Sequence, residues 1–554
     1  MPKNPVTATN THHFPLRRSR RMLYASMAAA LLISAAVGTQ AMAALPADTP
    51  QPPSTAQQER GMSTGQPFLD PADADAGSAS DSNLTITLDA AQTRFDVSGK
   101  KVYGESYNGA FVAPTLHVQP GQNVTIHLVN HLTVATNLHF HGLHVSPEGQ
   151  SDDPFLCVAP GGSTTYELAI PADHPLGTFW YHSHAMGTTC PASGSASHAG
   201  HAGHAGHAGH ASMADMASMG DGGMMIGDVE NQIFAGLSGA LVVGDDRTLL
   251  PPELRQITTH TFALKDVQLD AGSHILQNTD TSEIDSGNPT VRLVNGRLRP
   301  VLTMRPNETQ LWRLANIGAD IFYQLRLDGY DFTVINEDGT PVAQTRNDDT
   351  LLLPPGKRYD VLVTAPSKPG SAALRTTAYS NGPQGDAYPD TSLATIKVAG
   401  GQVPRLPSVS GPMPTAPADL SAAPVAQHRT VELSQSEDDT EFYINGKPFS
   451  MDSSVFDTPA KLGTVEEWTI LNTSGEIHPF HLHTNAFQVT SINGVAQPYT
   501  HDQDIVPVPH AENGVPGKVV IRVAFADFPG KWMFHCHIAA HEDNGMMSHI
   551  DVVR

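Results

Sequence analysis

Histidines separated by a single residue occur at four places in this chain, and this spacing constrains the fold more than any other feature. The pairs are His139/His141, His182/His184, His481/His483 and His535/His537. Successive side chains of a β-strand point to opposite faces, so each pair directs both imidazole rings to one side of its strand. Four such pairs predict a β-protein in which several strands bring eight imidazoles to one buried metal cluster.

A second group of metal-binding side chains surrounds the last pair. Cys536 lies between the two histidines of that pair and faces the opposite way, and His541 and Met546 follow it. A thiolate, an imidazole and a weak thioether are ligands of a blue copper site, which needs one more imidazole. His478 precedes the third pair by an odd number of residues, so it is left free to complete this site.

These residues form the motifs HxHG, HxH, HPxHxH and HCHxxxHxxxxM in this order. With them the chain, from about Asn83 to its C-terminus, resembles the three-domain multicopper oxidases, the group of laccases and cuprous oxidases. The resemblance implies four copper ions: one type 1, one type 2 and two type 3. It assigns His139 and His481 to the type 2 ion. It assigns the type 3 ions to His141, His182 and His537 and to His184, His483 and His535, and the type 1 ion to His478, Cys536, His541 and Met546.

A weak internal repeat predicts the domain organisation. The segments 124–130, 310–316 and 467–472 share an apolar pattern that ends in Asn, and each opens what reads as one β-sandwich. A chain of 554 residues with 47 Gly and 43 Pro fits several β-rich domains. We therefore expect an all-β protein of three cupredoxin-like Greek-key β-sandwich domains. The expected bounds are 84–246, 247–400 and 428–554, with a linker at 401–427.

The middle domain has no histidine pair. Its His260 and His274 are typical of ordinary surface or core histidines. Since the outer domains each supply four of the eight paired histidines, the cluster is expected between them. We expect the middle domain to hold the two outer domains at the right distance.

The N-terminus has the features of an export signal. Residues 1–43 contain a basic region with Arg20-Arg21, an apolar run and a small-residue cleavage site, which resembles a twin-arginine signal. Residues 44–83 are poor in large apolar side chains and are expected to be a disordered leader. The mature protein is therefore expected to be periplasmic or secreted, without a membrane span. The net charge of −23 argues against nucleic acid as a partner.

An insert at 188–228 lengthens the first domain. Five histidines recur there at every third residue in an Ala-Gly background, and five methionines follow. Imidazole and thioether together suit copper, and thioether favours Cu(I). One interpretation is a loop that gathers or buffers copper; the other is a low-complexity linker without a specific role.

Two cysteines, Cys157 and Cys190, lie in the first domain apart from the metal ligand. In an exported protein this favours a disulfide between them. The alternatives are two unpaired buried thiols, or a Cys190 that belongs to the copper-binding loop.

Reduction of oxygen consumes protons, and two carboxylates are candidates for catalytic residues that supply them. Asp152 follows the HxHG motif, where the resembling family has an aspartate before Gly-Pro; Asp153 stands here in place of that glycine, so either carboxylate could act. Glu542 follows His541 directly and should face away from it if the strand continues.

The resemblance implies an oxidoreductase that couples four one-electron oxidations of a reducing substrate to the reduction of O2 to two waters. The electron would enter at the type 1 copper, where the counterpart of His478 lies near the surface in family members, and pass through Cys536 to His535 and His537. The substrate would be a phenol or aromatic amine, as in laccases, or Cu(I). The His/Met insert and residues 541–547 favour a role in copper tolerance.

Two alternatives belong to other classes. A copper storage protein would explain the insert, but not the four ordered motifs. A copper nitrite reductase would usually need only two such domains and lacks the HxHG and HxH pairs.

Overall fold

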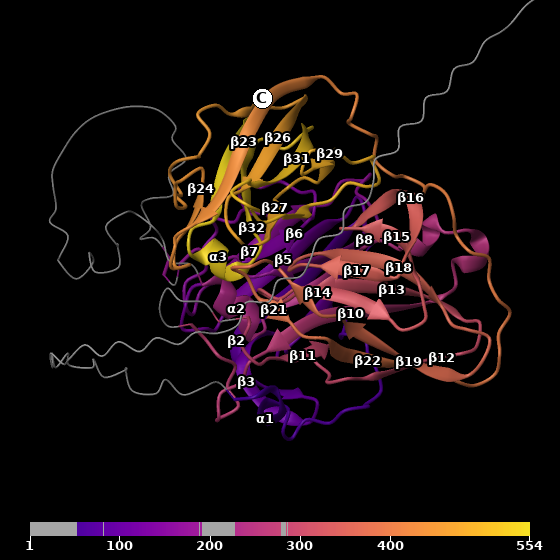
Figure 1. Ribbon diagram of the computed structural model, residues 1–554. Helices are drawn as coiled ribbons and strands as arrows, with labels where there is room; N and C mark the ends of the chain where they lie inside the picture. Colours follow the sequence, from indigo (N-terminus) through magenta and orange to yellow (C-terminus); the bar gives the residue numbers. More distant parts are fainter. Residues whose placement is uncertain (1–52, 81, 188, 191–227, 279–283, 285) are drawn as a thin grey trace, which may run out of the picture. The chain divides into compact units, whose positions relative to one another are not determined.

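The computed structural model describes residues 53–80, 82–187, 189–190, 228–278, 284 and 286–554. The predicted export signal (1–43) and nearly all of the predicted insert (188–228) lie outside these residues. Strands dominate the described part and form three pairs of sheets along the chain (Figure 1). None of the described helices is long and apolar enough to cross a membrane. The predicted all-β class is confirmed.

The first sandwich contains two of the four histidine pairs. One sheet has the order β1-β2-β5-β7 with β3 paired to β2, and the other has the order β4-β9-β8-β6. The strands are β1 (Ala76–Ala79), β2 (Asn83–Val97), β3 (Lys100–Tyr107), β4 (Ala113–Val118), β5 (Asn123–Asn130), β6 (His139–His141), β7 (Ser163–Ala169), β8 (Gly177–His182) and β9 (Ser238–Val243). Val124, Ile126 and Leu128 of β5 are at most 1% exposed. Their alternation therefore places one face of this strand in the core, as predicted.

The second sandwich packs a six-stranded sheet, β11-β10-β13-β18-β15-β16, with a five-stranded one, β12-β22-β19-β14-β17. The first sheet consists of β10 (Thr258–Val267), β11 (Val291–Val294), β13 (Thr309–Asn316), β15 (Phe332–Glu337), β16 (Thr340–Asp348) and β18 (Arg358–Thr364). The second consists of β12 (Val301–Met304), β14 (Tyr323–Leu327), β17 (Thr350–Leu353), β19 (Gly370–Thr376) and β22 (Thr391–Val398). A small ribbon of β20 (Tyr379–Ser380) and β21 (Ala387–Tyr388) lies beside them.

The third sandwich has the same plan, with sheets β24-β23-β26-β31-β28-β29 and β25-β33-β32-β27-β30. The first contains β23 (Val425–Gln435), β24 (Phe442–Ile444), β26 (Thr464–Asn472), β28 (Phe487–Ile492), β29 (Val495–Ala496) and β31 (Gly517–Phe525). The second contains β25 (Ala460–Lys461), β27 (His478–Leu482), β30 (Ile505–Val508), β32 (Gly530–Cys536) and β33 (Met547–Val553). Because β23 begins at Val425, it starts within the predicted linker.

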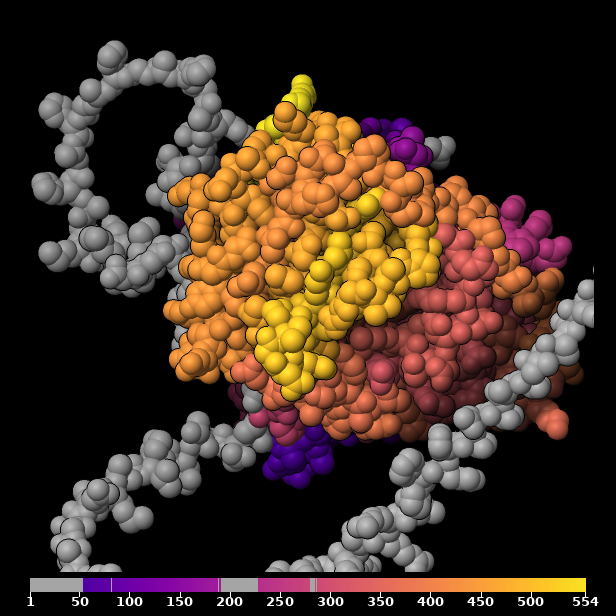
Figure 2. Space-filling view, turned by 45° about the horizontal axis from the view of Figure 1, so that its top comes forward, coloured from indigo at the N-terminus to yellow at the C-terminus, as the bar shows by residue number. Residues whose placement is uncertain are grey.

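Few helices accompany the strands. They are α1 (Thr55–Gln58), α2 (Val229–Ala235), α3 (Ala539–Asp543) and the 3-10 helices at Asp246–Leu249 and Pro252–Leu254. Trp180 of the first sandwich, Ala315 of the second and Ala539 of α3 belong to one buried apolar cluster, so the three sandwiches share a core where they meet. Figure 2 shows the yellow C-terminal residues at the surface between the orange part of the third sandwich and the salmon part of the second.

Each sandwich contains one copy of the predicted repeat: β5, β13 or β26. Each copy pairs in parallel with an earlier strand, respectively β2, β10 and β23. Each ends in a fully buried asparagine, Asn130, Asn316 or Asn472. Asn130 Nδ2 donates to the carbonyl oxygens of Val134 (2.9 Å) and Val158 (2.8 Å), and the other two asparagines make corresponding pairs of bonds. The repeat is therefore structural, and the three cupredoxin-like domains are confirmed.

The predicted disordered leader (44–83) is wrong for its described part, residues 53–80. This segment lies against the second sandwich, where Phe68 enters the core and Glu59 forms a two-bond salt bridge to an arginine between β11 and β12. Gln58 is 2% exposed, and its side chain accepts a hydrogen bond from the backbone of the second sandwich. A few specific contacts hold this polar segment in place, and amino-acid composition alone does not reveal such contacts.

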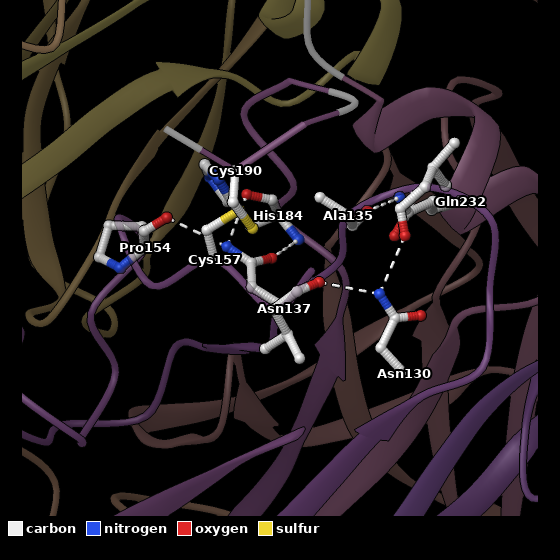
Figure 3. Close-up of a disulfide and its surroundings, with 10 residues drawn as sticks. Asn130, Ala135, Asn137, Pro154, Cys157, His184, Cys190 and Gln232 are labelled. Carbon is white, nitrogen blue, oxygen red and sulfur yellow. Dashed lines mark hydrogen bonds between the residues drawn. A yellow bond between two sulfur atoms is a disulfide. The ribbon is translucent and has the colours of Figure 1, made fainter. Parts of the chain in front are cut away.

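A disulfide joins Cys157 to Cys190, so the predicted pairing is confirmed and its two alternatives are excluded. It lies beside the side chain of Asn137 (Figure 3). Asn137 Nδ2 donates to the carbonyl oxygens of Pro154 (3.0 Å) and His184 (2.9 Å), and Asn137 Oδ1 accepts from the His184 N–H (2.8 Å). The disulfide and this amide therefore fix the backbone of one of the paired histidines.

Removing this disulfide should destabilise the first domain. Its cysteines are 33 residues apart, and closing a loop of this length stabilises a fold by about 2–4 kcal/mol through the entropy of the unfolded chain. We expect the double variant Cys157→Ala/Cys190→Ala to unfold at a lower urea concentration, as followed by circular dichroism. The reduced wild type is the control, because it also lacks the disulfide, and its urea midpoint should match that of the double variant. A wild type whose midpoint does not change on reduction would contradict the expectation.

Candidate metal centres

Cys536, His478 and His541 meet within the third sandwich. The Sγ atom of Cys536 lies 3.6 Å from Nδ1 of each histidine, and the two Nδ1 atoms are 3.2 Å apart. One sulfur and two nitrogens in this arrangement suit a single copper ion. Burial raises the pKa of the Cys536 thiol well above its usual range. The thiol therefore needs a bound cation to become a thiolate, as metal coordination provides.

Met546 is fully buried next to this group. Its carbonyl oxygen accepts from the Cys536 N–H (3.1 Å), and its own N–H donates to the carbonyl of His541 (2.8 Å). The HCH motif lies at the end of the strand before the last: β32 ends at Cys536, α3 carries His541, and β33 then returns beside β32. Gly545, with φ of 112°, permits the sharp turn between α3 and β33.

The eight paired histidines meet where the first and third sandwiches face each other. They lie in β6 and close to or just beyond the C-terminal ends of β8, β27 and β32, and all are at most 1% exposed. His139 stacks on His483 and His141 stacks on His481, with ring centroids 3.8 Å apart in both cases. Each stack joins a ring of the first sandwich to one of the third. Neither sandwich could therefore form this cluster alone.

The donor atoms of these rings fall into overlapping sets. Those of His184, His483 and His535 lie within 4.8 Å of one another, as do those of His139, His141 and His182, and those of His139, His481 and His483. His537 joins the second set, because its Nε2 lies 3.1 Å from Nδ1 of His141. The first of these sets is one of the two type 3 sets that the resemblance implies.

The ring nitrogens fit metal ions. In His139, His182 and His481, Nε2 is buried and has no hydrogen-bond partner among the described residues. Their Nδ1 atoms are held by the protein, through the Asp152 carboxylate and the carbonyl oxygens of Ser183 and Asp504 respectively. A metal-binding imidazole has this form, one nitrogen fixed and the other left as a lone pair toward the ion.

The charge state of the rings also suits metal binding. Burial is the main cause that lowers the pKa of these imidazoles, and the neighbouring rings lower it further. This holds for His139, His141, His182, His481, His483 and His537. They are therefore neutral near pH 7, as ligation requires.

Asp152 and Glu542 approach the cluster from its two sides. Asp152 Oδ1 lies 3.0 Å from His139 Nδ1 and accepts from the Phe140 N–H (2.9 Å). Asp153 instead accepts from the Phe155 N–H within its own loop. The structure therefore places Asp152, and not Asp153, against the histidines. Burial raises the pKa of Asp152 to about 7.

Glu542 lies between two histidines of the cluster. Its Oε1 is 3.2 Å from His184 Nε2 and its Oε2 is 3.0 Å from His535 Nδ1. The predicted strand does not continue to this residue; the helical turn of α3 places Glu542 toward the cluster and His541 toward Cys536. Burial raises the pKa of Glu542, but the two imidazoles outweigh it and lower the pKa to about 2.

A cavity of about 50 Å³ reaches His541. His478 does not line it, since its ring is fully buried and its Nε2 bonds to Ser474 Oγ at 2.8 Å. His541, and not His478 as expected, is therefore the histidine of this group that reaches a cavity. Glu476, 8% exposed, places Oε2 3.6 Å from His541 Nε2.

Several other histidines lie outside both metal groups, among them the two of the middle domain. His260 and His274 bond to carboxylates of Asp70 and Asp270, consistent with ordinary structural histidines. His501 contacts Glu337, His510 bonds to a backbone carbonyl, and neither lines the cavity beside His541.

Sequence reasoning missed three side chains at these centres: Glu476, Asp504 and Arg358. Asp504 precedes β30 and contacts His141, while Arg358 comes from the second sandwich and bonds to Asp504. Glu476 lies two residues before His478, and that proximity was the available signal. Asp504 and Arg358 belong to none of the histidine motifs.

Three cupredoxin-like sandwiches, a Cys-His-His-Met group and eight histidines between the outer sandwiches define a copper enzyme of the oxidase class. Multicopper oxidase family models match residues 89–204, 259–401 and 422–554. The chain belongs to the multicopper oxidases. It is an oxidoreductase that couples oxidation of a substrate to reduction of O2, and four bound copper ions supply the one-electron chemistry.

Relatives and solved structures agree with this assignment. The chain is 26% identical over 456 residues to a multicopper oxidase of Staphylococcus aureus, covering 81% of this chain and 83% of that protein. It is 24% identical over 528 residues to a laccase of Bacillus subtilis, covering 83% and 92%. The fold matches a multicopper oxidase structure from Campylobacter jejuni with a TM-score of 0.71 and 24% identity, covering 89% of this chain and 97% of that one.

Proposed function

We propose that this oxidase takes its electrons from a metal cation that binds in the cavity beside His541. The observation that carries the proposal is the lining of this cavity, which includes four carboxylates: Asp320, Asp386, Asp439 and Glu476. No lysine or arginine is among the described residues that line it. A narrow cavity with charge of one sign attracts ions of the other sign, so it favours a cation over a neutral phenol.

The positions of two carboxylates support this proposal. Glu476 is held by Asn381, whose Nδ2 donates to Glu476 Oε1 at 2.7 Å, and its other oxygen is directed to His541. Asp320 accepts from the Ala539 N–H at 3.1 Å, at the start of the helix that carries His541. A cation bound to these oxygens would lie next to the ring of His541, so transfer of one electron would need only a short path.

Some relatives favour a metal donor as well. The structure from Campylobacter jejuni is described as a metallo-oxidase, and a protein of Gibberella zeae that is 24% identical over 507 residues is named an iron transport multicopper oxidase. Oxygen donors suit Fe(II), while the predicted His/Met insert suits Cu(I). Cu(I) and Fe(II) are thus the donors to compare. Phenols and aromatic amines remain the competing donors.

We assign the ligands to the four copper ions as the motifs imply. His478, Cys536, His541 and Met546 hold the type 1 ion, and His139 and His481 hold the type 2 ion. His141, His182 and His537 hold one type 3 ion and His184, His483 and His535 the other. The convergence of these donor atoms supports the assignment. Asp152 and Glu542 accept protons and pass them on at the histidine cluster, a role that their direct contacts with His139, His184 and His535 support.

Removing the charge of Glu476 should weaken use of metal donors selectively. We expect Glu476→Gln to raise KM for Cu(I) and Fe(II) about tenfold, equivalent to ~1.4 kcal/mol, with less than about a twofold change for a neutral phenol. Oxygen uptake with each donor measures this. Asp438→Asn, an exposed aspartate that does not line the cavity, serves as the control. Equal effects on the metals and the phenol would refute the metal-donor proposal.

Export and a role in copper homeostasis complete the proposal. The twin-arginine signal in residues 1–43 and the His/Met composition of the insert 188–228 support them. Fractionation of cells that express the full chain tests the location: activity retained in the cytoplasm would contradict export. Comparing the copper tolerance of cells that express the protein with and without the insert tests the role in copper homeostasis. Equal tolerance would show that the insert does not contribute to this role.

A further inference from the structure

The second sandwich, which has no paired histidine, reaches the histidine cluster through Arg358. This arginine is fully buried at the start of β18. Its Nη1 and Nη2 donate to the two carboxylate oxygens of Asp504, both at 2.7 Å, and its Nε donates to the carbonyl of Thr178 at 3.3 Å. Arg358 therefore joins its own sandwich to the first and the third at one point.

Asp504 in turn contacts two histidines that the ligand assignment proposed above gives to different copper ions. Its Oδ1 lies 3.0 Å from Nε2 of His141, and its carbonyl oxygen lies 2.8 Å from Nδ1 of His481. An ionised carboxylate can only accept hydrogen bonds, so Asp504 Oδ1, which also accepts from Arg358, accepts from the His141 Nε2–H. The proton is then on Nε2, and Nδ1 of His141 presents its lone pair toward His537 Nε2, 3.1 Å away.

Two glycines permit the close packing around this pair. A Cβ atom on Gly142, whose φ is 80°, would lie 2.3 Å from Asp504 Oδ2 and 2.5 Å from Arg358 Nη2. A Cβ atom on Gly356, whose φ is 83°, would lie 3.0 Å from His141 Cε1. Glycine in the HxHG motif thus allows Arg358 and Asp504 to approach the ring of His141.

We propose that Arg358 and Asp504 form a positioning pair for the oxygen-reducing cluster. Arg358 fixes both carboxylate oxygens of Asp504. Asp504 then sets which nitrogen of His141 faces a type 3 copper ion. It also sets which nitrogen of His481 faces the type 2 copper ion. The second sandwich consequently determines ligand geometry in a site to which it supplies no ligand.

Arg358→Lys tests this proposal, because lysine keeps the charge but cannot form the two parallel bonds. Residues that orient metal ligands typically contribute 10–100-fold to metal affinity. We therefore expect the variant to retain type 2 copper about 10–100-fold less tightly in competition with a chelator, and to show an altered type 2 EPR spectrum. The blue absorption should be unchanged, because His478, Cys536 and His541 all belong to the third sandwich.

Arg429→Lys is the matched control. Arg429 is buried and forms two bonds to the Glu466 carboxylate, at 2.6 and 2.8 Å, within the third sandwich. It should leave both copper signals intact. Asp504→Asn is a second test and should reproduce the loss seen with Arg358→Lys. Normal type 2 copper in both variants would overturn the proposal, and so would loss of the blue absorption together with type 2 copper, since the pair would then act on the fold as a whole.

Discussion

Cys536→Ser should abolish the blue absorption and reduce oxygen uptake by at least about 10³-fold, which corresponds to roughly 4 kcal/mol in the activation barrier. The Cys536 sulfur is the one thiol within 3.6 Å of both His478 and His541. A serine hydroxyl is a hard donor that does not ionise near neutral pH, so it cannot replace a thiolate for copper. Visible absorption, copper content and oxygen uptake with Cu(I) measure the effect.

The eight-histidine cluster should survive this substitution. Its rings lie on the other side of the strand from Cys536, so we expect the variant to lose one copper ion and keep the type 2 EPR spectrum. Met547→Leu provides the control, because Met547 follows Met546 directly but packs with Phe449 and Met533 in a separate apolar cluster. A Cys536→Ser protein that stays blue, or one that turns over at the wild-type rate, would refute the assignment of the type 1 ligands.

Glu542→Gln should slow oxygen reduction about 10²-fold, within the 10²–10⁴-fold range that proton transfer by a positioned side chain contributes. The amide keeps the size of the carboxylate and its position between His184 and His535. It cannot hold and release a proton as a carboxylate does. Steady-state oxygen uptake at saturating donor gives the rate, and copper content establishes that the ligands remain loaded.

The colour during turnover distinguishes this effect from a defect in electron entry. In Glu542→Gln, electrons enter normally and leave slowly, so the blue absorption should bleach in the steady state. In Glu476→Gln the slow step is donor oxidation at low metal concentration, and the blue absorption should persist. A Glu542→Gln protein that is slow but stays blue under a saturating donor would contradict a proton role at the cluster.

The convergence of the paired histidines, and of His478 and His541 on Cys536, could be predicted because the signal is local in the sequence. A spacing of two residues along a strand directs two rings to one face, and the structure brings His139 near His141 and His481 near His483 for this reason. The repeat that ends in Asn130 could also be read from the sequence, since the same buried hydrogen bonds recur in each sandwich. Both signals depend on strand geometry within a few residues.

The residues that were missed depend on contacts between distant parts of the chain. Arg358 and Asp504 are 146 positions apart, and Asp504 and His141 are 363 apart. No periodicity records such a contact. Glu542 does face away from His541, as expected, but the helical turn of α3 rather than a continued strand produces this orientation. Phe68 and Gln58 could not be predicted for the same reason, because their polar segment becomes ordered through a few contacts with the second sandwich, which is distant in the sequence.

The division of the eight histidines between the first and third sandwiches has a consequence for synthesis. His139 is made early and His537 close to the end of the chain. At roughly 5–20 residues per second, with N-terminal domains folding first, the two are separated by tens of seconds on the ribosome. A nascent chain can therefore hold half of the ligands but not the complete cluster. Reactivity toward oxygen can begin only after His537 has been made, so a product truncated before this residue cannot carry it.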